Sequence, residues 1–406
     1  MKDLGVGIVG CGVISTIYMQ NLAAFRGVRL VACADILEPA ARIQAEKFGI
    51  RPLSIDALMR DPEVDVVVNL TTPNAHFEVS HAALTAGKHV FSEKPLCVAA
   101  EDGHRLVQEA NRRGLKFGCA PDTFLGAGGR LARETVDGGK VGSILAGSCS
   151  LMSRGMEHWH PNPGFFFQRG GGPMLDMGPY YLAALCNLLG PVDSVQAKAS
   201  IGYAERVVTA EGPNKGSRIP VETPTTIMAL LRFVSGADIV LSMSWDVWKH
   251  GHAPIELYGT DGSLRVPDPN FFGGLVEVTE RGGDWQLLDS SNRPYGKPNW
   301  RSPIWPASAP DRANYRCLGI ADLASAVLQG TPHRSSGAFA AHVLEVMYAI
   351  LQAGADGGTI KIVSRIERPA ALSDTEAASY WRGSSMIRKS VERFSEKIML
   401  KQKISA

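Results

Sequence analysis

Apolar and polar positions in the first 120 residues alternate between two spacings. Short apolar runs rich in β-branched residues indicate strands, and the stretches between them carry apolar side chains at helical spacing. The predicted strands lie at residues 6–9, 30–34, 64–70, 89–91 and 116–119, and the predicted helices at residues 14–25, 39–48, 75–86 and 100–112. This alternation is typical of a doubly wound parallel sheet, the Rossmann type of α/β fold.

The pattern changes after about residue 122. A helix at residues 130–136, a strand at 143–151 and a long loop at 153–173 are predicted first, followed by an apolar helix at 180–189. Five strand-like runs then succeed one another without intervening helices, at residues 192–199, 225–234, 237–245, 255–259 and 275–279. Successive strands of this kind indicate a mostly antiparallel sheet.

Two helices and a strand close the second region, at residues 320–329, 338–353 and 359–362. A chain of 406 residues is too long for one ordinary core, so at least two domains are expected. We therefore expect an α/β domain at residues 1–122 and an α+β domain at 123–365. The basic, polar residues 366–406 are expected to form a C-terminal extension.

Composition and charge exclude several classes of protein. The net charge of +2 indicates neither a nucleic acid nor an anionic membrane as partner. We find no secretory signal and no uninterrupted apolar run that approaches the length of a membrane span. Seven cysteines are scattered without a C-x-x-C motif, which indicates reduced thiols and a cytoplasmic protein.

A glycine-rich turn at residues 6–14 has the features of a dinucleotide cradle. It follows a predicted strand and opens a predicted helix, whose free N–H groups favour an anion. Gly10 permits the tight turn, and Gly12 lets the backbone approach a pyrophosphate. Ser15 stands where a third glycine is usual, so the prediction of a dinucleotide site depends on the strand before the turn and the helix after it. The expected cofactor contacts here are Gly10, Gly12, Val13 and Ile14.

Asp35 ends the next predicted strand, at the spacing expected for an acid that binds the ribose diol. Its charge would repel the extra phosphate of NADP, and no arginine follows it, so NAD is favoured over NADP. The alternative is a glycine-rich turn in a doubly wound fold that binds no dinucleotide.

Two further motifs together resemble the Gfo/Idh/MocA family of oxidoreductases. Glu93-Lys94-Pro95 follows a strand, and Gly170-Gly-Gly-Pro-Met-Leu-Asp-Met-Gly-Pro-Tyr180 is similar to the family signature G-G-x-x-x-D-x-G-x-H. The resemblance covers about residues 4–365. It implies a Rossmann domain and an α+β domain whose sheet packs one face on helices. The open face commonly forms a subunit interface, so a homodimer or homotetramer is expected.

The resemblance also implies roles for individual residues. Lys94 matches the catalytic lysine beside the nicotinamide, and Asp176 matches the catalytic aspartate. Tyr180 stands where the family usually has a histidine, which is the residue that exchanges the substrate proton. The residues expected along the cofactor are Thr71, Pro73, Asn74, His76, Glu93 and Lys94.

The chemistry of alcohol oxidation leaves two assignments for the proton. A hydride leaves for the nicotinamide, and the hydroxyl proton needs a base. Tyr180 is too weak a base unless a cation such as Lys94 stabilises its phenolate. Alternatively, Lys94 takes the proton itself, with its pKa lowered by burial, the nicotinamide charge and its neighbours. Asp176 would hold Lys94 or a sugar hydroxyl in place. The alternative for Asp176 is a role as a helix N-cap, and the alternative for Tyr180 is a role as a core aromatic residue.

The loop before the Asp176 helix has a composition that suits a sugar. Trp159 would pack on the apolar face of a ring, while His158 and His160 would bond hydroxyls. A His-x-His pair without a third or fourth ligand does not predict a metal site. Asp122, at the end of the last Rossmann strand, is expected to border the substrate pocket.

These observations lead to one main hypothesis and two alternatives. We expect an NAD-dependent oxidoreductase that acts on a ring secondary hydroxyl of a sugar, glycoside or cyclitol, with this polyol as its small-molecule partner. The alternatives are a ligand-sensing regulator of the same fold and a glycosidase that recycles NAD. Lys94 and Asp176 favour an enzyme over a regulator. Arg316 and His342, on predicted helices, are expected to have solvated or structural roles outside the site.

Overall fold

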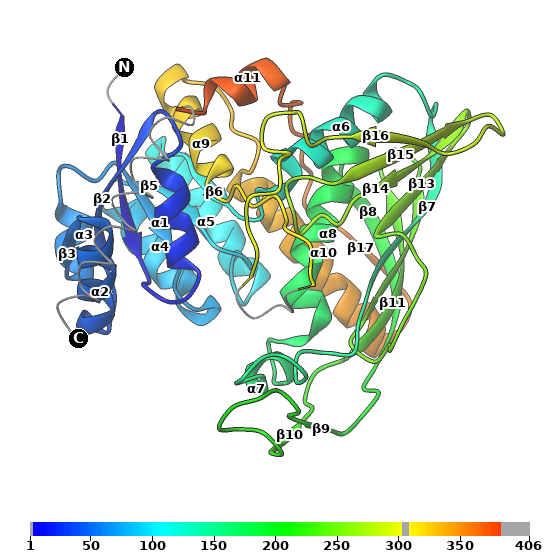
Figure 1. The fold of residues 1–406 in the computed structure, drawn as a ribbon, viewed down its shortest axis with the longest axis horizontal. Helices are drawn as coiled ribbons and strands as arrows, with labels where there is room; N and C mark the ends of the chain where they lie inside the picture. The colour runs from blue at the N-terminus through cyan, green and yellow to red at the C-terminus, as the bar shows by residue number, and fades with distance from the viewer. Residues whose placement is uncertain (1–2, 303–307, 383–406) are drawn as a thin grey trace.

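The computed structural model describes residues 3–302 and 308–382 and contains two large sheets with helices around them (Figure 1). The first sheet has six parallel strands in the order β3-β2-β1-β4-β5-β6. The elements of this domain are β1 (Leu4–Val9), α1 (Ser15–Leu22), β2 (Val28–Ala34), α2 (Glu38–Phe48), β3 (Arg51–Leu53), α3 (Ile55–Arg60), β4 (Val66–Asn69), η1 (Pro73–Ala75), α4 (His76–Thr85), β5 (His89–Ser92), α5 (Ala100–Arg113) and β6 (Phe117–Cys119).

This first domain confirms the predicted Rossmann fold. All four residues of β4 are buried, as expected for a parallel strand covered on both faces. The chain order reverses between β1 and β4, so the carboxyl ends of these strands form the crevice where doubly wound sheets bind ligands. The prediction missed β3 and α3, which are short.

The second sheet has nine strands in the order β16-β15-β14-β13-β7-β12-β11-β8-β17. Its strands are β7 (Ile144–Met152), β8 (Val192–Ser200), β11 (Thr226–Phe233), β12 (Asp238–Ser244), β13 (Ile255–Gly259), β14 (Gly262–Val266), β15 (Leu275–Glu280), β16 (Gln286–Asp289) and β17 (Thr359–Lys361). Every neighbouring pair is antiparallel except β7 and β12, which confirms the mostly antiparallel prediction. The strands β14 and β16 were not predicted.

One face of the second sheet is covered and the other is open. Along β11, Ile227, Ala229 and Leu231 are buried, while Met228 and Leu230 between them are exposed. The covering helices are α8 (Gly172–Leu189) and α10 (Gly337–Asp356), and α10 also packs on α5 of the first domain (Figure 1). Alternating burial of this kind is the pattern of a half-covered antiparallel sheet.

Helix α10 is apolar over most of its length, although His342 and Glu345 interrupt it, so it is not the uninterrupted apolar run that the sequence analysis sought. By length and composition it is the one described helix that would suffice to cross a membrane. More than half of its apolar window is buried in the core, against β8, α5 and α8. A core helix between two domains is apolar on most sides for the same reason that a membrane helix is.

Helix α8 begins eight residues earlier than predicted, at Gly172 instead of residue 180. The Gly-Gly-Gly-Pro run is read as a loop from its composition, although proline is common in the first turn of a helix. Because the N-cap is Gly171, Asp176 lies inside the helix and is not an N-cap residue. Pro179 also lies within the helix, one residue before Tyr180.

The segments 153–171 and 201–224 form a small side lobe at the lower edge of the second domain (Figure 1). It contains α7 (Gly164–Phe167) and the two-stranded sheet of β9 (Glu205–Val207) and β10 (Arg218–Pro220). The lobe has its own apolar cluster, separate from the main core, in which Phe167 packs with Trp245.

Three further helices complete the fold: α6 (Ala127–Asp137), which follows the 3-10 turn η2 (Thr123–Leu125), α9 (Leu318–Gln329) and α11 (Asp374–Ser379). The described part of the predicted extension, residues 366–382, packs on its own chain. Asp374 pairs with Arg130 of the second domain at 3.0 Å, and Arg382 donates to the Phe25 carbonyl of the first at 2.6 Å. Residues 383–406 lie outside the described residues.

Candidate active site

The glycine-rich turn between β1 and α1 has the shape of a dinucleotide cradle. Gly10 has a φ of +99°, and a Cβ added there would lie 2.6 Å from the Leu70 carbonyl group, so only glycine fits. A Cβ added at Gly12 would meet no atom within 4 Å, which leaves the backbone open to a ligand. Val13 is 98% exposed and Ile36 89% exposed, an unusual exposure for apolar side chains. These features fit a dinucleotide.

Asp35 shapes this cradle directly. One carboxylate oxygen accepts a hydrogen bond from the Cys11 N–H at 2.7 Å, and the other accepts one from the Leu37 N–H at 2.8 Å. The carboxylate is thereby held at the rim of the turn, at the carboxyl end of β2. Asp35 is half-buried, and its lone pairs that these amides do not use are available to a ribose diol.

The loop after β4 is tied to the Lys94 segment. Thr71 donates through its N–H and its hydroxyl to the Asn69 side-chain oxygen, at 3.2 and 2.7 Å. His76 is 1% exposed, and its ring nitrogens lie 2.7 Å from the Pro95 carbonyl and 3.1 Å from the Thr71 carbonyl. His76 therefore links the two segments from beneath. Its neighbours Pro73 and Asn74 are exposed on η1, in the place expected for cofactor contacts.

Lys94, Asp176 and Tyr180 meet between the two domains. The Lys94 Nζ donates to the Asp176 carbonyl at 2.8 Å and to the Asp176 carboxylate at 3.1 Å. The same nitrogen lies 5.2 Å from the centre of the Tyr180 ring. The three residues come from the end of β5 and from one face of α8, where positions i and i+4 are neighbours. The predicted catalytic residues are thus brought together, and their roles stay predictions.

The charge state of Lys94 differs from the expectation that Lys94, with a lowered pKa, takes the substrate proton. Burial lowers its pKa, but Asp176, Tyr180 and Glu93 together outweigh burial and raise the pKa above its ordinary value. The sequence analysis expected the neighbours of Lys94 to lower this pKa, because it had not placed so many anionic and polar groups around the amine. Without a bound cofactor, Lys94 is a cation.

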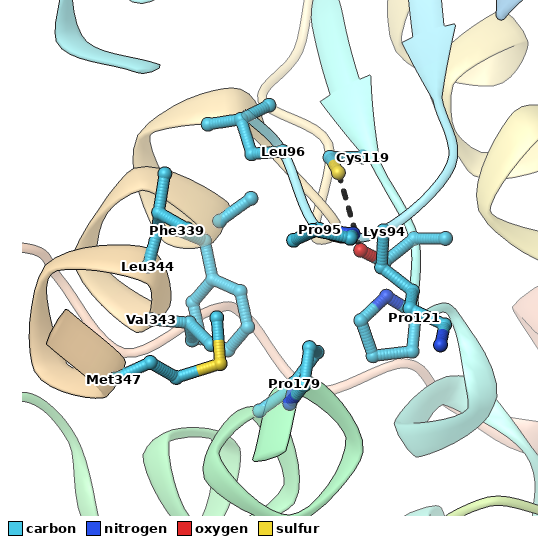
Figure 2. Close-up of a pocket in the computed structure, with 13 residues that line it drawn as sticks. Lys94, Pro95, Leu96, Cys119, Pro121, Pro179, Phe339, Val343, Leu344 and Met347 are labelled. Carbon is cyan, nitrogen blue, oxygen red and sulfur yellow. Dashed lines mark hydrogen bonds between the residues drawn. The ribbon is translucent and has the colours of Figure 1, made fainter. Parts of the chain in front are cut away.

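Glu93 organises the backbone beside Lys94. It is 8% exposed, accepts the Tyr18 hydroxyl of α1 at 2.8 Å and accepts the Lys94 N–H at 2.8 Å. Behind this segment, side chains of α8 and α10 line a small apolar cavity (Figure 2). The Lys94 backbone is therefore held by Glu93, and Lys94 is itself one of the residues that line the cavity.

Arg316 is the functional candidate that the sequence analysis placed outside the site. It lies in the loop before α9, and its guanidinium donates to the Tyr180 hydroxyl at 3.4 Å. Burial lowers the pKa of Arg316, but Tyr180, Glu93 and Tyr18 raise it above its ordinary value, so the group is a cation. No local pattern around residue 316 signals this contact, because its partner is 136 residues away.

Asp122 is buried beneath the site and does not border the pocket through its carboxylate. One carboxylate oxygen accepts the N–H groups of Cys317 and Gly319, at 3.1 and 2.8 Å, at the start of α9. The side chain is 1% exposed, and burial raises its pKa to about 6. The expected substrate contact is replaced by a support for the loop that carries Arg316.

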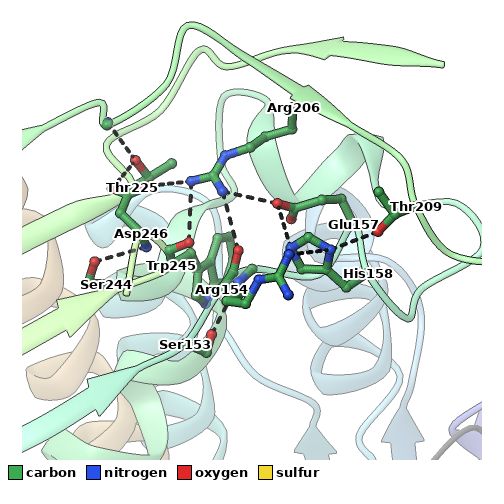
Figure 3. Close-up of polar contacts among 12 residues, drawn as sticks. Ser153, Arg154, Glu157, His158, Arg206, Thr209, Thr225, Ser244, Trp245 and Asp246 are labelled. Atoms are coloured by element: carbon green, nitrogen blue, oxygen red, sulfur yellow. Dashed lines mark hydrogen bonds and ion pairs between the residues drawn. The ribbon is translucent and has the colours of Figure 1, made fainter. Parts of the chain in front are cut away.

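The histidines and the tryptophan of the predicted sugar loop lie in the side lobe. A His158 ring nitrogen lies 2.7 Å from the Thr209 hydroxyl, and the other nitrogen lies 3.3 Å from the Glu157 carboxylate (Figure 3). The rings of Trp159 and His160 meet edge to face, and Trp159 is 42% exposed. Among the contacts recorded for the described residues, none joins these three side chains to Lys94 or Tyr180.

Two other expectations concern residues outside this cleft. His342 is fully buried on α10, where its ring accepts the Val192 N–H at 3.1 Å and lies 2.7 Å from the Ser364 hydroxyl. Its expected structural role is confirmed by these contacts.

All seven cysteines are buried and free. Within residues 3–302 and 308–382, no group of three His, Cys, Asp or Glu residues is placed to hold a metal ion.

A Rossmann cradle, and a lysine at the adjoining strand end that meets an aspartate and a tyrosine of a second domain, define a nicotinamide-dependent oxidoreductase. Residues 4–120 match the oxidoreductase family with an NAD-binding Rossmann fold, and residues 130–265 match the GFO/IDH/MocA C-terminal domain. The chain belongs to the Gfo/Idh/MocA family of NAD(P)-dependent oxidoreductases.

Characterised relatives share most of the chain. Myo-inositol 2-dehydrogenase of Thermotoga maritima is 28% identical over 282 residues, which cover 69% of this chain and 79% of that protein. Levoglucosan dehydrogenase of Pseudarthrobacter phenanthrenivorans is 26% identical over 337 residues, which cover 75% and 84%. The chain is thus an oxidoreductase related to sugar and inositol dehydrogenases.

Solved structures share the fold. A levoglucosan dehydrogenase in complex with NADH and levoglucosan has a TM-score of 0.75 at 22% identity, covering 89% of this chain and 100% of that one. An oxidoreductase from Agrobacterium radiobacter in complex with NAD+, L-tartaric acid and magnesium has a TM-score of 0.73 at 20% identity, covering 89% and 99%.

Proposed function

We propose that this protein is an NAD-dependent dehydrogenase or reductase that acts on a ring secondary hydroxyl of a sugar, glycoside or cyclitol. The observation that carries the proposal is the Lys94 Nζ, held 3.1 Å from the Asp176 carboxylate and 5.2 Å from the Tyr180 ring beside an open dinucleotide cradle. Relatives named for myo-inositol, levoglucosan and 1,5-anhydro-D-fructose support a polyol as the substrate.

Tyr180 handles the proton in this proposal. When bound, NAD supplies the acceptor for the hydride of the alcohol carbon. Tyr180, as a phenolate, takes the proton of the substrate hydroxyl, and the cationic Lys94 stabilises both the phenolate and the substrate oxygen. The raised pKa of Lys94 supports this division of roles, because it favours the protonated amine, which supplies charge and does not accept a proton. Asp176 keeps the ammonium group in place through two hydrogen bonds.

Asp35 supports NAD over NADP. Its carboxylate stands at the rim of the cradle, and Ile36, not an arginine, follows it. We expect Asp35→Ala to raise the dissociation constant of NAD by about ten- to a hundredfold, because a charge-assisted hydrogen bond to the ribose is lost. NADP should be weakened much less. Dissociation constants of both cofactors for wild type and variant test this, and equal weakening would remove Asp35 from the ribose.

The deciding experiment is NADH formation by the purified protein with NAD across a panel of sugars, glycosides and cyclitols. Lys94→Ala serves as the inactive control in each assay. A Lys94-dependent signal would support the proposal and identify the substrate class. If protein that binds NAD gives no signal, the proposal fails, and a ligand sensor or a glycosidase that recycles NAD takes its place. Hydrolysis of a glycoside without net NADH would separate these two.

The open face of the second sheet supports a homodimer or homotetramer. Four large exposed side chains with apolar surface lie on its outer side: Met228, Leu230, Val240 and Tyr258. Leu230 and Val240 are direct neighbours across β11 and β12, so Leu230→Glu should dissociate the assembly in light-scattering measurements.

We also propose a cytoplasmic location, which the seven free, buried thiols support.

A further inference from the structure

We propose that Arg316 is a positioning residue that stabilises the phenolate of Tyr180 as the second cation of the site. This inference rests on the proposed function, because it concerns how Tyr180 becomes a base. The guanidinium contacts the hydroxyl of Tyr180 at 3.4 Å, whereas the Lys94 Nζ lies over the ring at 5.2 Å. The two cations therefore approach the phenol at different places.

The charge of Arg316 is available to Tyr180, while that of Lys94 is already paired. The Lys94 Nζ has the Asp176 carboxylate at 3.1 Å. Among the described residues, no carboxylate lies within ion-pair distance of Arg316, and the Tyr180 hydroxyl is the one acceptor recorded for its guanidinium. Glu93 and Asp122 act on it from farther away. An unpaired cation within about 4–6 Å favours the charged form of an acid.

The position of Arg316 is fixed by its backbone. Its carbonyl accepts the Asn21 side-chain amide of α1 at 3.1 Å. The next residue, Cys317, has a φ of +90°, a conformation that is costly outside glycine, and its N–H donates to the buried Asp122 carboxylate at 3.1 Å. On the other side, the Tyr315 ring packs on Trp381 of the C-terminal segment at 5.6 Å. A strained residue held by several partners is typical of a functional loop.

The proton balance assigns each group one task. As the substrate O–H bond breaks, a new O–H bond forms on Tyr180, and the phenolate becomes a neutral phenol. In the reverse direction, Tyr180 returns this proton to the oxygen of the carbonyl. Arg316 keeps all its protons throughout, so its effect is on how readily Tyr180 loses its own.

A spectroscopic titration tests this without an assay of turnover. The ultraviolet absorption of tyrosinate is followed against pH, and the spectrum of each protein is compared with the same protein carrying Tyr180→Phe. The difference isolates Tyr180 from the eight other tyrosines. We expect Arg316→Met and Arg316→Gln to move the Tyr180 signal to higher pH by about one unit. Arg316→Lys should return the Tyr180 signal most of the way to its wild-type pH. Arg312→Met, on the same loop, should leave the Tyr180 signal where it is in wild type.

The pH profile of kcat supplies the second readout. In Arg316→Gln, its acid limb should move to higher pH in parallel with the Tyr180 signal, with the KM for NAD changed less than about twofold. A Tyr180 titration that is identical in wild type and in both neutral variants, each shown to be folded by thermal unfolding, would overturn the inference. If the wild type turns over no polyol, the proposed function fails, and the titration still decides the role of Arg316.

Discussion

Arg206 of the side lobe is buried and Arg316 of the cleft is half-buried, and the groups around the two guanidinium cations differ. Arg206 donates to the Glu157 carboxylate at 3.0 Å and contacts the Asp246 carboxylate, as well as two carbonyl groups (Figure 3). Arg316 has no carboxylate partner among the described residues and donates to Tyr180. A buried cation paired with carboxylates holds chain segments together, whereas an unpaired one beside a phenol acts on its chemistry.

The largest effect is expected on the cleft side of this comparison, from Lys94→Ala. Turnover should fall by about a thousandfold or more, since the cation that stabilises the phenolate and the substrate oxygen is lost. NAD binding should stay nearly unchanged. Steady-state kinetics and NAD titration check this, with the exposed Lys140→Ala as the matched control. Undiminished turnover in Lys94→Ala would show that the reactive centre lies elsewhere.

Arg206→Met is expected to give the opposite result, a loss of stability without a loss of chemistry. It leaves the buried Glu157 and the half-buried Asp246 without their cation, so the free energy of unfolding should fall by about 3–5 kcal/mol. The kcat of the folded variant should stay within about twofold of wild type. Denaturant unfolding measures the first quantity and initial rates the second.

The matched control for Arg206 is Arg218→Met on the same hairpin. Arg218 pairs with Glu205 at 2.9 Å, but the side chains are 70% and 51% exposed, so the change should cost less than about 1 kcal/mol. If Arg206→Met lowers kcat as strongly as Lys94→Ala does, while both variants remain folded, the division between a structural lobe and a catalytic cleft is wrong.

The sequence predicts the cradle and the Lys94 segment well because their signals are local. Gly10 needs a φ that only glycine adopts easily, and Asp35 follows the next strand at a regular spacing. Lys94 precedes a proline at the end of a strand, where doubly wound sheets bind ligands. Each of these signals lies within a few residues of the turn or strand that carries it.

The contacts of the second domain are harder to predict because they join distant segments. Glu157 pairs with Arg206, 49 residues away, and Arg316 meets Tyr180 across 136 residues. Composition alone suggested His158 for a sugar site, and the commoner solvated or structural role of such residues kept Arg316 out of the predicted cleft. The early start of α8 was a miss that had a local signal, since Pro173 occupies a first-turn position that favours proline.

Asp122→Asn tests the support beneath Arg316 through its pH dependence. Burial raises the pKa of Asp122 to about 6, so the folded protein binds this proton more readily than the unfolded chain between about pH 4 and 6. The free energy of unfolding should therefore fall as pH rises through this window, by about 3 kcal/mol at most from this group. In Asp122→Asn, whose amide oxygen still accepts both N–H groups, this contribution should disappear.

Denaturant unfolding of both proteins at about pH 4 and about pH 7 measures this difference. His342 acts in the opposite sense, because burial lowers its pKa to about 4 and protonation below its unfolded pKa favours unfolding. This contribution is common to wild type and variant, so it cancels when they are compared. Parallel pH dependences in the two proteins would show that Asp122 is not a buried carboxylate with a raised pKa.

The smallest effect concerns whether the lobe also touches the substrate. Trp159 is 42% exposed, so part of the residue is open to solvent, and an indole that packs on a sugar contributes about 1 kcal/mol. Trp159→Ala should then raise the KM for the best polyol of the panel several-fold, with the dissociation constant of NAD unchanged. Trp248→Ala, whose ring is 70% exposed and stacked on Arg154 at 3.4 Å, is the matched control. An unchanged KM in Trp159→Ala would leave the lobe with the structural role that Arg206 defines. A raised KM would show instead that the lobe has two functions. Arg206 would hold the segment in place, and the exposed Trp159 ring of that segment would contact the substrate.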